Sequence, residues 1–353
     1  MSNNISTVEF LNNSSMKITI DGHTIEVEPG TTILQAARMI GGACVPPTMC
    51  YYSKLKDCGG KCRCCLVEVA KGSDRDPRPM PKLQPSCVTA AQDGMEVLSA
   101  NSPRVVAARK AITEFLLINH PLDCPVCDQA GECNLQDLAM GNKDFHSRFR
   151  EQKVTTPSED IGPYISLNKN RCILCYRCVK LAEQLTPKRV HGVLYRGDHA
   201  EISAYIQNSI DSEFSGNMID VCPVGALTDK TFRFKSRVWF TKKMDAHRDC
   251  PTCSGKTTLW MFGDEVLRVT ARKDKYNEVE DFICNDCRFD HKKKEDWVIE
   301  GPHRFEKDSV LNVNRNEVKS AEGVEIKTSV LTLEGREIDR EKISMKDVPF
   351  DKN

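Results

Sequence analysis

The sequence predicts an α+β fold built from several small domains, and three observations support that prediction. Its 353 residues suffice for two or three domains of ordinary size. Short stretches of alternating apolar residues predict β-strands beside brief helical patterns. Eighteen cysteines, most of them in tight groups, indicate compact units arranged around metal sites.

The first domain is expected over residues 15–100 as a small mixed α/β unit. Apolar residues alternate on both sides of Asp21-Gly22, which predicts a hairpin. Thr31-Thr32 offers the start of a helix before an apolar run. A second pair of strands is expected at 66–69 and 95–98.

Three further segments are expected after this domain. Residues 101–240 form a cysteine-rich α/β domain, which opens with a helix capped by Ser102 and ended before Pro121. Residues 241–300 form a small β-rich cluster or metal module. Residues 301–353 form a charged tail with one alternating stretch at 324–333, and we expect it to be a docking segment.

Charge and hydropathy exclude several classes of protein. The 50 acidic and 50 basic residues balance, and no basic groove with interleaved aromatic residues occurs, so we expect no nucleic-acid partner. Apolar runs fall far short of the about 20 residues that span a bilayer. The N-terminus does not resemble a secretory signal. We therefore expect an intracellular chain without direct membrane insertion.

The cysteines are expected to bind metal rather than to form disulfides. The cytosol disfavours structural disulfides, and cysteines spaced i, i+3 converge on one metal centre. No dinucleotide fingerprint, phosphate-binding loop or separate nucleophile arrangement occurs, so we expect no active site of the chain's own. Because clusters carry single electrons, a flavin on a partner has to split the electron pair of a hydride.

The first set of candidate ligands is Cys50, Cys62, Cys65 and Cys87. Its layout is similar to that of plant-type ferredoxins, which hold a [2Fe–2S] cluster, although the first gap is longer. Glycines in this loop let backbone N–H groups approach the inorganic sulfides. Three neighbouring cysteines are expected to be small buried thiols, namely Cys44, Cys58 and Cys64.

The second set is His120, Cys124, Cys127 and Cys133, in the string NHPLDCPVCDQAGEC. Three cysteines leave a [4Fe–4S] cluster one ligand short, and a neutral imidazole can complete it, since histidine ligates iron in Rieske centres. His120 can equally cap the end of the preceding helix. The residues alone leave both roles open.

The third set is Cys172, Cys175, Cys178 and Cys222. The string RCILCYRC supplies the C-x2-C-x2-C half of a bacterial ferredoxin motif. Ala182 stands where the fourth cysteine usually follows, and the cysteine of VCPVGALT can complete a second [4Fe–4S] site if the chain folds back.

The fourth set is Cys250, Cys253, Cys284 and Cys287, arranged as two C-x2-C pairs. Structural zinc ribbons use the same spacing. Spacing alone therefore leaves a zinc ion and an additional [4Fe–4S] cluster open.

In their order, these motifs resemble the large iron–sulfur subunit of respiratory complex I, the NADH–quinone oxidoreductase, over roughly residues 15 to 300. The strings that carry the resemblance are CYYSKLKDCGGKCRCCLVEV, NHPLDCPVCDQAGEC, RCILCYRC and VCPVGALTDKT. It implies a β-grasp domain with a [2Fe–2S] cluster on the first set. It also implies two [4Fe–4S] clusters, on the second set, including His120, and on the third.

The chain departs from that family in two respects. Members usually continue into a large molybdopterin-oxidoreductase-like domain, and residues 245–290 resemble only its first module, so no molybdopterin is expected. Some bacterial members hold an additional [4Fe–4S] cluster there through C-x2-C-x3-C and a distant cysteine. Thr257 occupies the third position of that motif, and Cys287 is the candidate substitute.

The resemblance implies an electron-transfer subunit of NADH:quinone oxidoreductase. Electrons would pass from the flavin of an NADH-binding partner through the clusters to quinone-proximal iron–sulfur subunits. This chain itself would bind no flavin or NAD. Such a hetero-oligomer would be peripheral on the cytoplasmic side of the inner membrane. The alternatives are a diaphorase small subunit of an NAD-linked hydrogenase or formate dehydrogenase, and a zinc-stapled structural or interaction protein.

Overall fold

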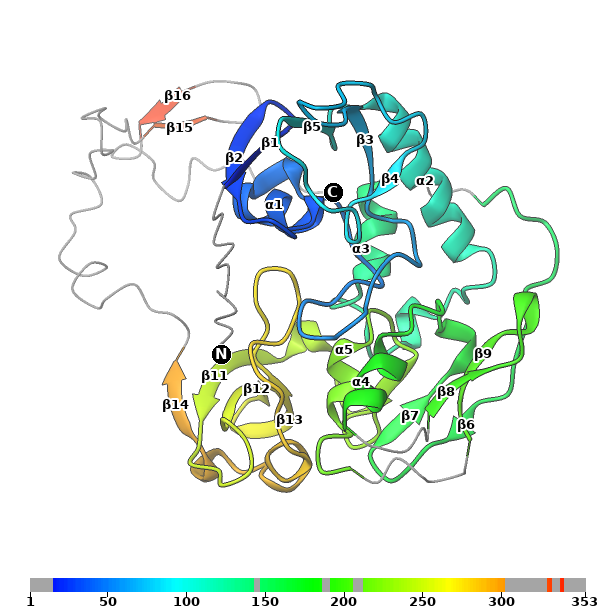
Figure 1. Cartoon of the computed structure of the whole chain (residues 1–353). Helices are drawn as coiled ribbons and strands as arrows, with labels where there is room; N and C mark the ends of the chain where they lie inside the picture. The colour runs from blue at the N-terminus through cyan, green and yellow to red at the C-terminus, as the bar shows by residue number, and fades with distance from the viewer. Residues whose placement is uncertain are drawn as a thin grey trace, which may run out of the picture. The chain divides into compact units, whose positions relative to one another are not determined.

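A computed structural model describes residues 15–142, 147–185, 191–205 and 212–301, with two short strands at 329–331 and 337–339 (Figure 1). The chain divides into two compact units, Met1–Glu300 and Gly301–Asn353. Small sheets and short helices make up the first unit, which confirms the predicted α+β class.

The first sheet has five strands in the order β2-β1-β5-β3-β4. Their bounds are Met16–Ile20 for β1, His23–Val27 for β2, Leu66–Lys71 for β3, Gln84–Pro85 for β4 and Met95–Leu98 for β5. β1 runs antiparallel to β2 and parallel to β5, and the helix α1, Ile33–Ile40, shares a buried core with this sheet. This mixed sheet with one covering helix is the β-grasp arrangement.

Local sequence explains where these elements begin. Asp21 and Gly22 have φ values of 49° and 88°, as a two-residue hairpin turn requires. The Thr32 hydroxyl accepts a hydrogen bond from the Gln35 backbone N–H, and the Gln35 side chain accepts one from Thr32, which forms a capping box. The hairpin and the helix start predicted from the sequence are thus confirmed.

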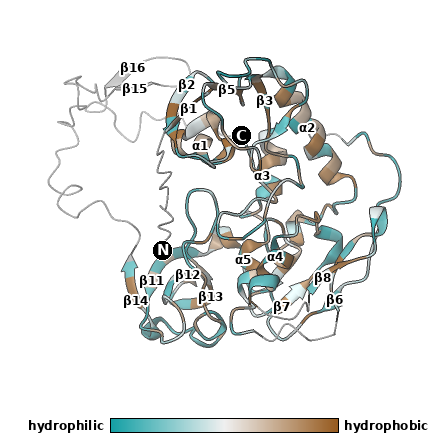
Figure 2. Cartoon of the chain, viewed as in Figure 1, coloured by the Kyte–Doolittle hydropathy of each residue, from teal (hydrophilic) through white to brown (hydrophobic). Residues whose placement is uncertain are grey.

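The described residues of the cysteine-rich segment that follows form four α-helices, several one-turn 3-10 helices and two small sheets. The α-helices are α2 Pro103–Leu117, α3 Asn134–Gly141, α4 Arg177–Leu185 and α5 Asn217–Val221. The strands β6 Glu159–Asp160, β7 Ile165–Leu167 and β10 Leu227–Asp229 form one sheet, and β8 His191–Leu194 pairs with β9 Glu201–Ala204. Ser102 caps α2 by accepting from the Val105 N–H, as predicted. Apolar side chains of α4 and α5 join the largest buried cluster (Figure 2).

A four-stranded sheet has the order β13-β12-β11-β14. Its strands are β11 Lys242–His247, β12 Lys256–Phe262, β13 Glu265–Ala271 and β14 Val298–Gly301, and a one-turn π-helix, η6, spans Asp286–Asp290. The long loop between β13 and η6, drawn in yellow, extends toward α1 (Figure 1).

That loop is tied to the β-grasp domain by buried polar contacts. Glu278 accepts a 2.7 Å hydrogen bond from Arg38 Nη2 on α1 and a 2.9 Å hydrogen bond from the Ser53 backbone N–H. The Val279 N–H donates to the Tyr52 hydroxyl at 2.7 Å. The five-stranded and the four-stranded sheets are therefore joined through one loop within the first unit.

The second unit contains a described pair of antiparallel strands, β15 Ser329–Leu331 and β16 Glu337–Asp339. The alternating stretch predicted at 324–333 includes β15, and the rest of it lies outside the described residues. None of the helices in the described segments is both long and apolar enough to cross a membrane.

Candidate metal centres

The first cysteine set meets at the edge of the β-grasp domain, where a loop faces the strand end near Cys87. The Cys50 thiol interacts with those of Cys62 and Cys87, and the Cys65 thiol interacts with that of Cys87. Cys50, Cys65 and Cys87 are buried. The four sulfur atoms therefore lie close together, as the four ligands of a cluster with two metal ions must.

Backbone N–H groups converge on these sulfur atoms. The N–H groups of Lys61 and Cys62 each donate to Cys50 Sγ at 3.3 Å, and that of Gly60 donates to Cys87 Sγ at 3.2 Å. Hydrogen bonds from the Cys62 and Cys87 thiols, and from the backbone N–H groups of Cys62 and Lys61, hold the pKa of Cys50 well below its usual value. Such donors favour the thiolate, which is the form that binds metal.

The three remaining cysteines of this region hydrogen-bond to backbone carbonyls. Cys44 Sγ donates to Ile20 O at 3.8 Å, and Cys58 Sγ donates to Cys50 O at 2.8 Å. Cys64 Sγ donates to Cys62 O at 3.9 Å. Burial raises the pKa of Cys58 to about 11 and also raises that of Cys44. These contacts fit packed thiols rather than metal ligands.

The second set lies on the loop between α2 and α3. Cys127 and Cys133 are buried, whereas Cys124 is exposed. His120 and Cys124 line one pocket beside α2. The thiols of Cys124 and Cys133 are each close enough to that of Cys127 to influence ionisation. The side chains of the second set thus lie near one another, although their sulfur atoms are not gathered around one point.

His120 has the properties that a metal-ligating imidazole needs. Its Nδ1 atom is buried and has no hydrogen-bond partner among the described residues. Burial, with the positive charges of Arg171 and Lys153, lowers the pKa of His120 to about 4, so the ring is neutral at physiological pH. An orphaned nitrogen in a neutral ring beside three cysteines fits a ligand better than a helix cap, which would donate to carbonyls.

All four cysteines of the third set line one small pocket. Apolar side chains such as Ile202 and Val224 complete its walls. Burial raises the pKa of Cys172 to about 12 and raises those of Cys175, Cys178 and Cys222 as well. The N–H of Leu174 donates to Cys172 Sγ at 3.4 Å. A dry space lined by thiols suits a buried cluster, because its iron ions offset the free-energy cost of ionising buried cysteines.

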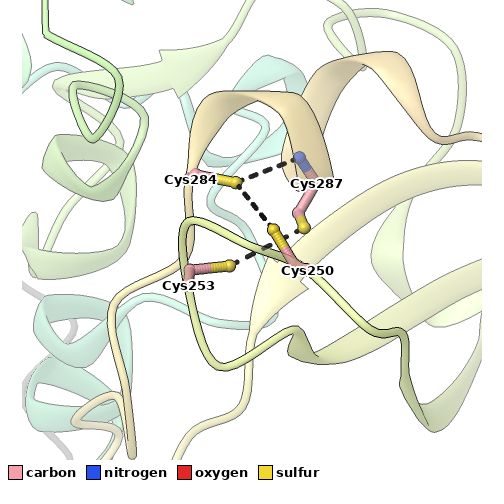
Figure 3. Close-up of side chains that lie close together, drawn as sticks. All are labelled: Cys250, Cys253, Cys284 and Cys287. Atoms are coloured by element: carbon pink, nitrogen blue, oxygen red, sulfur yellow. Dashed lines mark hydrogen bonds between the residues drawn. The ribbon is translucent and has the colours of Figure 1, made fainter.

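The fourth set brings together two segments of the third module, which spans residues 241–300 (Figure 3). Cys250 and Cys253 lie on the loop between β11 and β12, Cys284 lies just before η6, and Cys287 lies in η6. Their four sulfur atoms all lie within 4.8 Å of one another. Cys287 therefore completes the set, while Thr257 is buried in β12 and donates to Ala246 O.

Three family profiles match the chain in succession. A 2Fe-2S iron-sulfur cluster binding domain matches residues 13–102, and the NADH-ubiquinone oxidoreductase-G iron-sulfur binding region matches residues 109–146. The ferredoxin-like domain of NADH-quinone oxidoreductase subunit 3 matches residues 162–228. The three matches contain the first, second and third cysteine sets respectively.

Curated relatives extend this similarity beyond the profiles. The G subunit of NADH-quinone oxidoreductase from Rickettsia bellii is 37% identical over 314 residues, which are 89% of this chain and 44% of that protein. The NADH-ubiquinone oxidoreductase 75 kDa subunit of Reclinomonas americana is 39% identical over 78% of this chain and 38% of its own length. The chain is a homologue of the NADH-quinone oxidoreductase G subunit. It spans less than half the length of these relatives.

A solved structure also resembles this G-subunit homologue. One chain in a crystal structure of NAD+-reducing [NiFe]-hydrogenase is 29% identical, with a TM-score of 0.54. The match covers 64% of the present chain and 92% of the hydrogenase chain.

Sequence patterns did not reveal three residues at these sites of the G-subunit homologue. Arg177, between two cysteines of the third set, is buried and donates to Tyr51 O at 2.7 Å. His191 Nε2 lies 3.4 Å from Cys178 Sγ. A Cβ atom on Gly225 would lie 2.2 Å from Cys127 Sγ. Only the spacing of the cysteines is visible in the sequence, and these contacts depend on the tertiary fold.

Proposed function

We propose that this chain is an electron-transfer subunit that relays single electrons between iron–sulfur clusters in an NADH:quinone oxidoreductase. The observation that carries the proposal is the contiguity of the first three cysteine sets within one compact unit. The Cys222 thiol lies close enough to that of Cys133 to influence the ionisation of Cys133, and Arg177 contacts both the Tyr51 and the Val221 carbonyl. Electrons could thus pass through the unit in short steps.

Each set would hold a cluster suited to its geometry. We infer that the first set, Cys50, Cys62, Cys65 and Cys87, binds a [2Fe–2S] cluster, because its sulfur atoms are adjacent along a loop and a strand end. His120, Cys124, Cys127 and Cys133 would bind one [4Fe–4S] cluster, and Cys172, Cys175, Cys178 and Cys222 a second. When bound, the clusters supply one-electron redox chemistry.

The chain's own residues would position and tune these clusters. Backbone N–H groups from residues 60–62 point at Cys50 and Cys87, and hydrogen bonds to ligating sulfur stabilise added negative charge. The apolar wall of the third set excludes water, which keeps its cluster buried. Cys124, which is exposed, marks the second set as the one nearest the surface.

The proposed assembly is hetero-oligomeric. A flavin-bearing, NADH-binding partner would deliver electrons, and quinone-proximal iron–sulfur subunits would receive them. We infer a peripheral position on the cytoplasmic side of the inner membrane as part of that complex. The names of the relatives support this assembly, since each is a subunit of an NADH–quinone or NADH–ubiquinone oxidoreductase.

Anaerobic iron analysis with low-temperature EPR of the reduced full chain tests the proposal. One [2Fe–2S] and two [4Fe–4S] clusters require about ten irons per chain and three distinct signals. The variant His120→Ala should lose or alter one signal and leave the other two unchanged. A folded, colourless chain that contains zinc and no iron would instead support a zinc-stapled structural protein.

A second candidate function is the diaphorase small subunit of an NAD-linked hydrogenase. The hydrogenase chain that resembles this protein favours it, because 92% of that chain is matched. The two functions share the cluster chemistry and differ in their partners. Affinity purification under native conditions separates them: membrane-complex subunits support the first candidate, and a hydrogenase supports the second.

A further inference from the structure

The distances between sulfur atoms in the fourth set are those of ligands around a single ion. Cys250 Sγ lies 3.7 Å from Cys284 Sγ, and Cys253 Sγ lies 3.7 Å from Cys287 Sγ (Figure 3). A tetrahedral zinc ion with Zn–S bonds of about 2.3 Å has neighbouring sulfur atoms about 3.8 Å apart. The observed pairs match that spacing.

A [4Fe–4S] cluster does not fit the same four residues. Its irons stand at alternate corners of a cube, and each thiolate binds a different iron from outside. The ligating sulfur atoms therefore lie much further apart than four sulfur atoms that share one ion. In the fourth set all of them lie within 4.8 Å of one another, so no space is left between them for a cube.

The third set also has four cysteines, but their arrangement differs from that of the fourth set. Its four cysteines line one pocket, but their sulfur atoms do not all lie within 4.8 Å of one another. Within the described residues, the fourth set alone forms a group of three or more potential ligands whose donor atoms all lie this close together. The two tetracysteine sites are therefore built for different occupants.

The backbone around the fourth set is also arranged for a closed ion site. Gly255 has a φ of 63°, and its N–H donates to Cys253 Sγ at 3.4 Å. A Cβ atom at this position would lie 2.0 Å from Arg248 O, so only glycine allows the loop to turn back after the second cysteine. The N–H of Cys287 donates to Cys284 Sγ at 3.5 Å. Donors of this kind stabilise thiolates at a metal.

We propose that Cys250, Cys253, Cys284 and Cys287 bind one zinc ion, which acts as a structural staple and takes no part in electron transfer. The ion links the β11–β12 loop to η6. The loop that carries Glu278 and Val279 to the β-grasp domain ends at η6, so the ion fixes one end of that connection. Arg288 in η6 forms a buried ion pair with Asp220 in α5, which anchors the staple beside the third set.

This inference rests on sulfur positions and goes beyond the proposed function. Elemental analysis of the unmodified full chain should find one zinc per chain in addition to the cluster iron. Zinc K-edge X-ray absorption should show four sulfur neighbours at about 2.3 Å. Four additional irons without zinc, or a rhombic ferric EPR signal from a single iron in a sulfur site, would overturn the proposal. So would a chain without metal at this set.

Matched cysteine variants assign the ion to these residues. Cys250→Ser should reduce the zinc content by at least half and leave iron and the cluster EPR signals unchanged. Cys44→Ser, which removes a thiol bonded to Ile20 O, should leave zinc at one per chain. Loss of four irons in Cys250→Ser would contradict the zinc assignment. If Cys250→Ser does not fold, X-ray absorption on the unmodified chain still decides. Low cluster iron beside intact zinc would contradict only the electron-transfer role.

Discussion

Arg177 Nη2 donates a 2.7 Å hydrogen bond to the Tyr51 carbonyl oxygen, which joins the third cysteine motif to the loop of the first. Arg177 is 2% exposed, and its guanidinium lies 5.2 Å from the centre of the Tyr52 ring. Among the described residues, no carboxylate forms an ion pair with it. A buried cation needs a compensating negative charge, and a thiolate-ligated cluster supplies one.

We therefore expect Arg177→Met to lower the reduction potential of the cluster on the third set. A nearby positive charge stabilises the reduced, more negative form of a cluster, so its removal makes reduction harder. The interaction is on the order of 1–2 kcal/mol at an effective dielectric constant of 20. That is roughly 40–90 mV for a one-electron couple.

EPR-monitored redox titration measures this shift. Arg177→Lys keeps the charge and should retain most of the potential, although it loses the forked geometry that reaches both carbonyls. An unchanged potential in Arg177→Met would mean that the guanidinium only fastens the two loops together.

The second prediction concerns Gly225, which lies against Cys127 of the second set. A Cβ atom here would lie 2.2 Å from Cys127 Sγ and 3.1 Å from Gln129 Cβ, so the sulfur atom would have to move. Gly225→Ala should therefore lose the cluster proposed for the second set, seen as about four irons fewer per chain and one missing EPR signal.

Gly141 offers the matched control for that substitution. A Cβ atom on Gly141, at the end of α3, would meet nothing within 4 Å. Gly141→Ala should keep all of the iron. If Gly225→Ala also keeps it, Cys127 is not a ligand in the position described.

The third prediction concerns His191, whose Nε2 lies 3.4 Å from Cys178 Sγ in a buried site. In the tautomer that carries its proton on Nε2, the ring donates to the sulfur of Cys178, a proposed cluster ligand. Loss of such a hydrogen bond costs about 1 kcal/mol, or roughly 40 mV for one electron. We expect His191→Leu to lower the potential of the cluster on the third set by that amount.

His199 serves as the control for His191 because its side chain is 84% exposed. His199→Leu should leave all cluster potentials unchanged. A shift in the potential of the [2Fe–2S] cluster with none in that of the third set would contradict the assigned contact.

The sequence could predict the local elements and the candidate ligands. It could not predict the residues that support them. Asp21-Gly22, Thr32 and Ser102 act on neighbours within three residues, so their turn and caps are readable from the sequence. The cysteine sets could be predicted because the spacing of their cysteines is typical of metal ligands. Arg177 bonds across 126 residues and Arg38 across 240, and no local pattern encodes such contacts.

The fourth set shows a further limit of sequence patterns. Two C-x2-C pairs serve zinc ribbons and clusters alike, so spacing could not choose between them. The choice depends on how closely two segments approach, and the packing of η6 against the β11–β12 loop determines that approach. The separation of the sulfur atoms is thus a property of the fold.

The fourth prediction concerns Glu278, which joins the third module to α1. Burial raises the pKa of Glu278, but hydrogen bonds from Arg38 and Ser53 outweigh it, so the net pKa lies below the usual value. A carboxylate with a lowered folded-state pKa stabilises the fold above its unfolded pKa of about 4.3, and the contribution is lost as pH falls through the folded value. The full contribution is therefore present at pH 7.

Glu278→Gln should reduce the free energy of unfolding by about 3 kcal/mol, because it leaves Arg38 buried without its partner. Denaturant unfolding of the metal-loaded chain, followed by circular dichroism, measures the loss. The loss should stay constant between pH 5 and 8, where the carboxylate remains ionised. Glu280→Gln, two residues along the same loop at an exposed position, should change stability by less than about 0.5 kcal/mol. Equal losses in the two variants would mean that the ion pair with Arg38 does not hold the module in place.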